Sequence, residues 1–232
     1  MVVSPATRPM PDPSLRARVD DLRVELVHLA SLTVDAVVSA TAALTEHDPV
    51  EADTVIRDDD AIDALRHSVE DECLRILGAP GLDPDDLRFV GVALRVAHDL
   101  ERSADLMVNV ARSTHRLGDT VLDERSRHLV HRLGRQAAVQ LRVAVNAFVD
   151  RDPSWAAALA DMDETLDELE KSVFRHVLGE EREQDETAVL RAVQLALVAR
   201  HYERVGDHAV SIAQHVHFVV TGEHSRYRRR HP

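Results

Sequence analysis

Apolar residues recur along most of this chain at the three-to-four-residue spacing of an amphipathic helix. Leu100, Ala104 and Met107, for example, mark one face of a segment whose other positions are largely polar. None of the nine prolines interrupts such a segment, and four of them follow an aspartate. Asp-Pro suits a helix start, because Asp accepts hydrogen bonds from free N–H groups and Pro is tolerated at the first position. Six helices are therefore predicted, over residues 13–47, 50–77, 84–117, 121–151, 153–178 and 185–221.

The second half of the chain repeats the first. Asp48 and the proline after it recur as Asp152 and its proline, 104 positions later. The run that begins at Glu101 recurs from Glu203, 102 positions later. Similar offsets in separate segments indicate an internal duplication, and helices joined by short loops pack up-down-up. We therefore predict an all-α fold of two tandem three-helix bundles related by internal duplication.

This organisation divides the chain into four predicted segments. The two repeats meet near a Gly-Asp pair at residues 118 and 119. The ends of the chain lack helical periodicity, and the C-terminal end is rich in arginine. The predicted segments are a disordered N-terminal tail at 1–12, a first repeat at 13–118, a second repeat at 119–223 and a basic C-terminal tail at 224–232.

Composition agrees with a globular helical protein. Hydrophobic residues make up 44% of the 232 residues and aromatic residues only 3%, which suits packed helices better than a β-sandwich. The net charge of −13 argues against nucleic acid as a partner, because phosphate contacts need a basic surface. The single cysteine, Cys73, excludes an internal disulfide, fits a reducing compartment and is expected in the core. No apolar run is expected to approach the roughly 18 residues of a membrane span, and no secretory signal is visible.

Acidic residues four positions apart recur at matched places in both halves. Residues at this spacing lie on one helix face, where two like charges repel by a few tenths of a kcal/mol. A cation between them would remove this penalty. Two such pairs on neighbouring helices would form an all-oxygen site, which suits hard cations such as Mg, Mn, Ca or oxidised iron. The pairs are Asp59/Asp63 and Glu101/Asp105 in the first half, and Asp163/Asp167 and Glu203/Asp207 in the second.

A solvated acidic face is the alternative interpretation. With 41 acidic residues in the chain, such pairs arise by chance about as often as they occur here. Their recurrence in both halves is more informative, although duplication alone could produce it. The pairs on the third and sixth helices lie away from the apolar stripes of those helices. Any metal is therefore expected on the bundle surface, open to solvent or to a partner.

Other motifs point to chemistry more weakly. His201, His208 and His215 recur every seven residues, and we interpret them as a polar stripe turned away from the acidic pair on the same helix. A single Glu-x-x-His, from Glu25 to His28, falls short of the two that a ferritin-like di-iron core needs. The sequence has no Gly-Lys-Ser/Thr phosphate loop and no His-Glu-x-x-His motif. It therefore gives no positive case for an enzyme.

Two runs resemble the signatures of a known family. Residues 100–105 read Leu-Glu-Arg-Ser-Ala-Asp, and residues 202–213 read Tyr-Glu-Arg-Val-Gly-Asp-His-Ala-Val-Ser-Ile-Ala. They resemble the first and second repeats of the PhoU family, and the resemblance extends over residues 15–223. The first run has Ser-Ala where Ile-Gly is common in the family, and Ser211 replaces the usual Asn. Neither departure touches the acidic residues.

The resemblance implies a function that composition does not. Members of this family are cytoplasmic accessory proteins of high-affinity phosphate transport, and they help to shut off the phosphate-starvation response. The resemblance implies two partners, the ATPase subunit of the phosphate transporter and a sensor histidine kinase, which would hold the protein at the inner face of the membrane. It also implies a homodimer that is not an enzyme.

The resemblance further implies that the acidic motifs bind metal ions, with Fe, Zn, Mn and Mg as candidates. In this sequence those motifs are Asp59, Asp63, Glu101, Asp105, Asp163, Asp167, Glu203 and Asp207. Two alternatives use the same carboxylates. One is a metal-buffering protein without a signalling partner, and the other is a carboxylate-bridged metalloenzyme such as a phosphatase.

Overall fold

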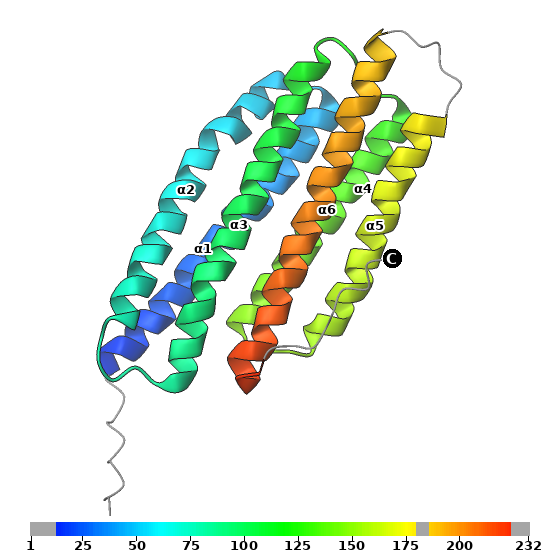
Figure 1. Ribbon diagram of the computed structural model, residues 1–232. Coiled ribbons are helices and arrows are strands. Elements are labelled where there is room, and N and C mark those ends of the chain that lie inside the picture. Colours follow the sequence, from blue (N-terminus) through cyan, green and yellow to red (C-terminus); the bar gives the residue numbers. More distant parts are fainter. Residues whose placement is uncertain (1–12, 180–185, 224–232) are drawn as a thin grey trace, which may run out of the picture.

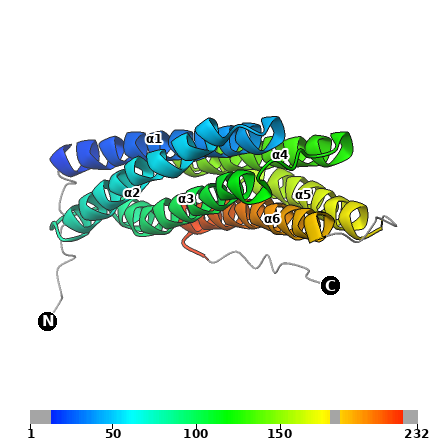
Figure 2. The same cartoon turned by 90° about the horizontal axis from the view of Figure 1, so that it is seen from above.

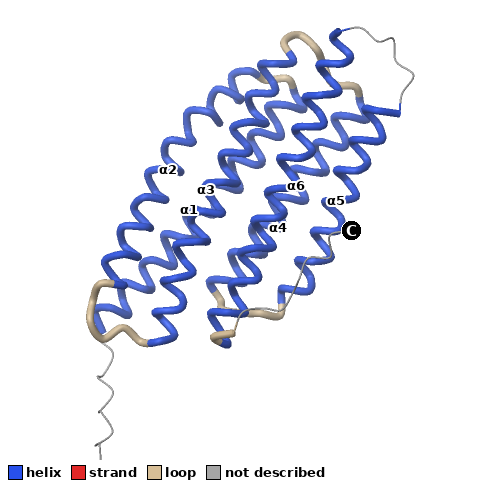
Figure 3. The backbone as a smooth tube through the Cα atoms, in the orientation of Figure 1, coloured by secondary structure: helices blue, strands red, loops and turns tan. Residues whose placement is uncertain are grey.

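The computed structural model describes residues 13–179 and 186–223 of the chain. Six α-helices fill these two ranges, and no strand occurs within them (Figures 1 and 3). The tails predicted at 1–12 and 224–232 lie outside the described residues. The helices are α1 (Pro13–Glu46), α2 (Pro49–Leu77), α3 (Pro84–Leu117), α4 (Glu124–Val149), α5 (Trp155–Gly179) and α6 (Glu186–Thr221).

The aspartates predicted to start helices cap two of them directly. The Asp48 side chain accepts hydrogen bonds from two N–H groups at the start of α2, and Asp83 accepts one at the start of α3. The predicted start of α4 was three residues too early, because Asp123 caps this helix. The predicted start of α5 was also early, because Asp152 accepts the N–H of Ser154 in the turn that precedes the helix.

The helices form two three-helix bundles that lie side by side. Helices α1, α2 and α3 pack on one another, as do α4, α5 and α6, while α1 on α4 and α3 on α6 join the two bundles. Figure 2 shows α1 and α4 together on one side of the molecule, with α2, α3, α6 and α5 on the other. The buried side chains form one continuous hydrophobic core. The predicted fold class is therefore confirmed, while the division into domains at residues 118 and 119 stays a prediction.

The duplication extends to backbone detail in the turns after α1 and α4. His47 has a φ of 60° and Arg151, 104 positions later, has a φ of 55°. Such left-handed values are uncommon for residues with a Cβ. In both turns the following aspartate donates its N–H to an alanine carbonyl, over 2.8 Å at Asp48 and 2.9 Å at Asp152. The two repeats thus use the same turn.

The first helix shows why hydropathy alone is ambiguous. The segment Ser14–Glu46 contains an 18-residue window with a mean hydropathy of 1.5, so it is long and apolar enough to cross a membrane by length and composition. Half of that window is buried inside the bundle. Leu22, Leu26 and Leu29 are fully buried, so the apolar side of α1 is used in the protein core. Cys73 is also buried, as predicted, and burial raises the pKa of its thiol to about 12.

Candidate functional site

The first acidic cluster lies between α2 and α3. Asp59 and Asp63 are one turn apart on α2, and Glu101 and Asp105 are one turn apart on α3. The pKa of Asp59 is raised to about 6, first by burial and then by the charges of Asp105, Asp63 and Glu101. Burial and the charge of Asp105 also raise the pKa of Glu101. The fold therefore brings the four predicted carboxylates of the first repeat close enough to repel one another.

The second acidic cluster lies between α5 and α6. Burial raises the pKa of Glu203 to about 7, and the charges of Asp207, Glu170 and Asp167 add to the effect. Asp163 has a different neighbour, because its Oδ1 lies 3.1 Å from the position that a Cβ on Gly206 would occupy. Asp207 and Asp167 thus act on Glu203, and Asp163 lies beside the glycine of the motif.

The sequence analysis missed Glu170. Its side chain lies three positions after Asp167 on the same face of α5, a spacing that could have indicated it. The repeat comparison concealed it, since the matching residue of the first repeat is the basic Arg66. Arg66 lowers the pKa of Glu101, whereas Glu170 raises that of Glu203. The two clusters therefore differ in charge at this position.

Each cluster also has a basic residue one turn before its glutamate. His98 Nδ1 lies 3.6 Å from Glu101 Oε2 in the first repeat. At the matching position of the second repeat, Arg200 Nη1 lies 3.0 Å from Glu203 Oε1 and 3.6 Å from Glu170 Oε1. Both basic side chains are largely exposed, so water screens these ion pairs and they offset the clustered negative charge only in part.

Glu203 is less open than its place outside the apolar stripe of α6 suggested. This residue is only 7% exposed, and Glu101 is half-buried. The helical wheel placed both glutamates outside the apolar stripe of their own helix. It could not show that α2 covers this side of α3, or that α5 covers this side of α6. The sequence analysis therefore overestimated how open this part of the site is.

The donor chemistry of the clusters fits a metal ion better than their geometry does. Within residues 13–179 and 186–223, no three His, Cys, Asp or Glu side chains are arranged as a ready-made metal site. However, the Oε2 atoms of Glu101 and Glu203 are both buried and accept no hydrogen bond from the described residues. A buried carboxylate oxygen without a partner is costly, and hard cations prefer such oxygens. A bound cation would supply the missing partner after side-chain rotation.

The histidine stripe of α6 does not face solvent throughout. His208 is half-buried in the seam between α3 and α6, where its Nδ1 lies 3.1 Å from both the hydroxyl of Ser103 and the carbonyl oxygen of Asp99. Burial lowers the pKa of His208, and it also lowers that of His201. His208 thus links the two repeats rather than belonging to either acidic cluster.

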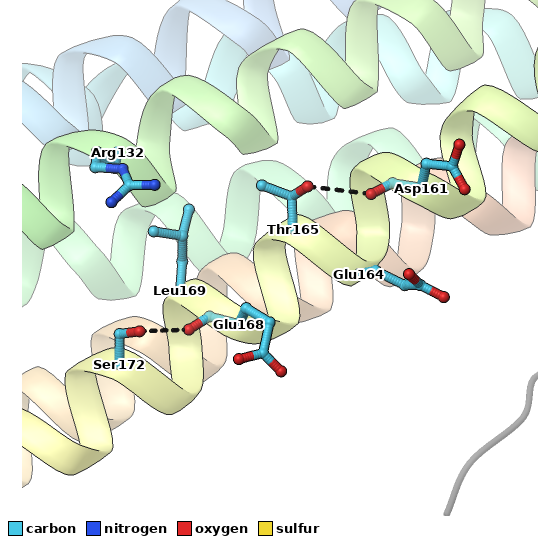
Figure 4. Close-up of a pocket in the computed structure, with 7 residues that line it drawn as sticks. All are labelled: Arg132, Asp161, Glu164, Thr165, Glu168, Leu169 and Ser172. Carbon is cyan, nitrogen blue, oxygen red and sulfur yellow. Dashed lines mark hydrogen bonds between the residues drawn. The ribbon is translucent and has the colours of Figure 1, made fainter.

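A shallow open depression of about 380 Å³ lies outside the acidic clusters, between α4 and α5 (Figure 4). The hydroxyls of Thr165 and Ser172 donate to carbonyl oxygens of their own helix, over 3.1 Å and 2.7 Å. None of the eight predicted site residues lines this depression. Its lining residues are Arg132, Asp161, Glu164, Thr165, Glu168, Leu169 and Ser172.

Comparison with known proteins matches both halves of the chain to the same domain family. The sequence profile of the PhoU domain matches residues 26–114 and again residues 130–216. The phosphate-specific transport system accessory protein PhoU homolog 1 of Mycobacterium tuberculosis (strain ATCC 25618 / H37Rv) is 34% identical over 206 residues. The matched region covers 88% of this chain and 92% of that protein.

Two crystal structures have a similar fold. PhoU from Pseudomonas aeruginosa has a TM-score of 0.82 and 30% sequence identity, over 90% of this chain and 99% of that one. The phosphate transport system regulatory protein PhoU from Streptococcus pneumoniae has a TM-score of 0.83 and 26% identity, over 92% of this chain and 100% of that one. The similarity therefore spans both bundles and nearly the whole length of each relative.

Proposed function

Because this chain belongs to the PhoU family, we propose that it acts as a negative regulator of high-affinity phosphate uptake and of the phosphate-starvation response. The observation that carries the proposal is the double family match, one in each bundle, to proteins named as accessory or regulatory components of phosphate transport. A regulatory role needs a surface that recognises partners rather than a reaction centre. The relatives are named as accessory proteins, which agrees with such a role.

In this proposal the protein is an adaptor. It links the ATPase subunit of the phosphate transporter to a sensor histidine kinase, and it works in the cytoplasm at the inner face of the membrane as a homodimer. The face formed by α2, α3, α6 and α5 is the candidate docking surface, because the helices that bear both acidic clusters lie there (Figure 2). A partner would contact both repeats at once on this face.

Metal ions on the acidic clusters would control the charge of this surface. The buried Oε2 atoms of Glu101 and Glu203 support the proposal, because each lacks a hydrogen-bond partner among the described residues. A bound Fe, Zn, Mn or Mg ion would neutralise several carboxylates and lower the cost of burying them against a partner. The residues that would hold the ions are Asp59, Asp63, Glu101 and Asp105 in the first repeat, and Asp163, Asp167, Glu203 and Asp207 in the second.

Deleting the gene tests the regulatory proposal. We expect the deletion strain to express a phosphate-starvation reporter in phosphate-rich medium, where the parent strain represses it, because the link between transporter and kinase is lost. The intact gene supplied in trans should restore repression. Reporter activity that stays at the parental level in a strain without a paralogue would contradict the proposal.

Elemental analysis tests the metal proposal. We expect Glu203→Gln with Asp207→Asn to lower the metal content of the purified protein while the helical circular-dichroism signal is unchanged, because the amides keep the shape of the side chains and remove two charges. Asp161→Asn with Glu164→Gln is the matched control, since these exposed residues of α5 lie outside the cluster. Equal loss of metal in both variants would indicate a general charge effect.

Metal content and the phosphate-starvation reporter together separate the adaptor from a metal-buffering protein. A buffer would exchange several ions reversibly and would not alter the reporter when its gene is deleted. An adaptor that uses metal needs both the cluster and the partners, so the Glu203→Gln and Asp207→Asn variant should fail to restore repression. A variant that loses metal and still restores full repression would leave metal without a role in regulation.

A further inference from the structure

A cluster of basic side chains lies where α1, the start of α3 and the end of α4 meet. Two arginines share one aromatic ring there: Arg23 Cζ lies 4.8 Å from the ring centroid of Phe89, and Arg151 Cζ lies 5.2 Å from it. Phe89 stacks in turn on Phe148, with 4.8 Å between centroids and 14° between planes. We refer to Arg23 and Arg151 as the arginine pair. Both rings are fully buried, so the aromatic surface of Phe89 beneath the two guanidinium groups belongs to the packed core.

The arginine pair is not fully neutralised by its surroundings. Arg151 Nη2 donates to Asp86 Oδ1 over 2.9 Å, and Arg23 Nη2 lies 4.0 Å from the same oxygen. Arg23 also pairs with Asp20, while burial and the charge of Arg151 lower the pKa of Arg23. Arg23 and Arg151 therefore share one half-buried carboxylate, Asp86, since Asp20 is 58% exposed and water screens its charge. This local excess of positive charge occurs in a chain whose net charge is −13.

Both members of the pair keep hydrogen-bonding capacity. The Nε atoms of Arg23 and Arg151 are buried and donate no hydrogen bond to the residues that the structure describes. The side chains are 26% and 27% exposed, so solvent reaches part of each guanidinium group. A partly desolvated guanidinium attracts an anion more strongly than one in open water. The exposed part of each guanidinium group is thus accessible to a small ligand, whereas the buried Nε donors become available only after the side chain rotates.

The backbone at Arg151 adopts the turn that both repeats share. Its φ of 55° lies in the left-handed region, which a residue with a Cβ enters only at an energetic cost. The equivalent turn of the first repeat has the same conformation but carries His47. The second repeat uses this strained position to place a guanidinium group over Phe89.

We propose that Arg23 and Arg151 together bind a small tetrahedral oxyanion, with inorganic phosphate as the ligand in solution. Guanidinium groups match the oxygens of phosphate with paired N–H donors, and two of them on a shared rigid ring can contact the anion from two sides. The bound anion would offset the excess positive charge. The site uses none of the acidic-cluster residues, and it rests on these contacts rather than on the proposed regulatory function.

Phosphate titration of the purified full-length protein tests the proposal. We expect inorganic phosphate to bind saturably and to raise the melting temperature, and chloride at the same ionic strength to do neither. Arg23→Gln and Arg151→Gln should each weaken binding about tenfold to a hundredfold, because each removes charge-assisted hydrogen bonds. Arg57→Gln is the matched control, since it removes one charge from an exposed arginine on α2 and should bind phosphate like the wild type.

Arg151→Lys is a second variant, which keeps the proposal testable if Arg151→Gln does not fold. It keeps the charge but loses the forked donor geometry, so its phosphate affinity should fall between those of wild type and Arg151→Gln. Three results would overturn the proposal: no saturable binding by the wild type up to about 10 mM phosphate, equal affinity in Arg23→Gln and wild type, or an equal response to chloride. Binding to phosphatidylglycerol vesicles that free phosphate does not compete would assign the pair to a lipid headgroup instead, and would also overturn it.

Discussion

Replacing Gly134 by alanine will lower the free energy of unfolding by about 2–4 kcal/mol. This glycine of α4 packs closely against α1: an added Cβ would lie 2.1 Å from Thr41 Oγ1 and 2.9 Å from Thr41 Cβ. Thr41 is β-branched and has little freedom to rotate in a helix. The alanine must therefore push α1 and α4 apart or displace the Thr41 side chain.

Displacing Thr41 also breaks a buried contact between the repeats. The Thr41 hydroxyl lies 2.7 Å from the hydroxyl of Tyr202, a fully buried residue of α6. Leaving that hydroxyl unpaired costs about 1–3 kcal/mol in addition to the overpacking. Thr41→Ala alone should be destabilising for the same reason. In the double variant with Gly134→Ala the two effects should total less than their sum, because both act through one contact.

Urea unfolding followed by circular dichroism measures this difference. Gly91→Ala is the matched control, because Gly91 lies inside α3, is exposed and would meet nothing within 4 Å of its new Cβ. Alanine is the better helix former, so this control should be stabilised by about 0.5–1 kcal/mol. A Gly134→Ala protein as stable as the wild type would show that the two bundles pack less tightly than described.

The metal-free protein will lose about 2 kcal/mol of stability between pH 5.5 and pH 8.5 through Glu203 alone. Burial and neighbouring carboxylates raise the pKa of Glu203 from 4.5 to about 7 in the folded protein. The folded state therefore binds this proton more tightly than the unfolded state. The stabilising effect is complete below the unfolded pKa and is lost as the pH rises through the folded pKa. Asp59, with a pKa of about 6, adds a smaller loss of the same sign.

Glu203→Gln should remove most of this pH dependence, because glutamine keeps the shape and carries no charge. The measurement is urea unfolding in chelator at several pH values, with Glu168→Gln as control, since Glu168 is exposed on α5 and outside the cluster. The control should follow the wild-type pH dependence in this range. A Glu203→Gln protein that does so as well would mean that the glutamate is solvated in solution.

Much of the fold could be read from the sequence because its signals are local. Helical periodicity, aspartates before prolines and the absence of prolines inside periodic segments act within a few residues of one another, so they predict helices without knowledge of the partners. The duplication is also a property of the sequence, and it placed Glu101 and Glu203 at equivalent positions. The start of α4 was predicted three residues too early, because no proline marks the cap of this helix, Asp123.

The tertiary structure decided which side chains meet. Spacing alone paired residues within one helix, but only the packing of α5 on α6 placed Glu170 near Glu203 and buried the latter. Likewise, Arg23 and Arg151 are far apart in sequence, and nothing local indicates that both lie over Phe89. Local patterns determine which face of a helix is apolar, whereas burial, pKa and long-range contacts depend on which other helix covers the remaining faces.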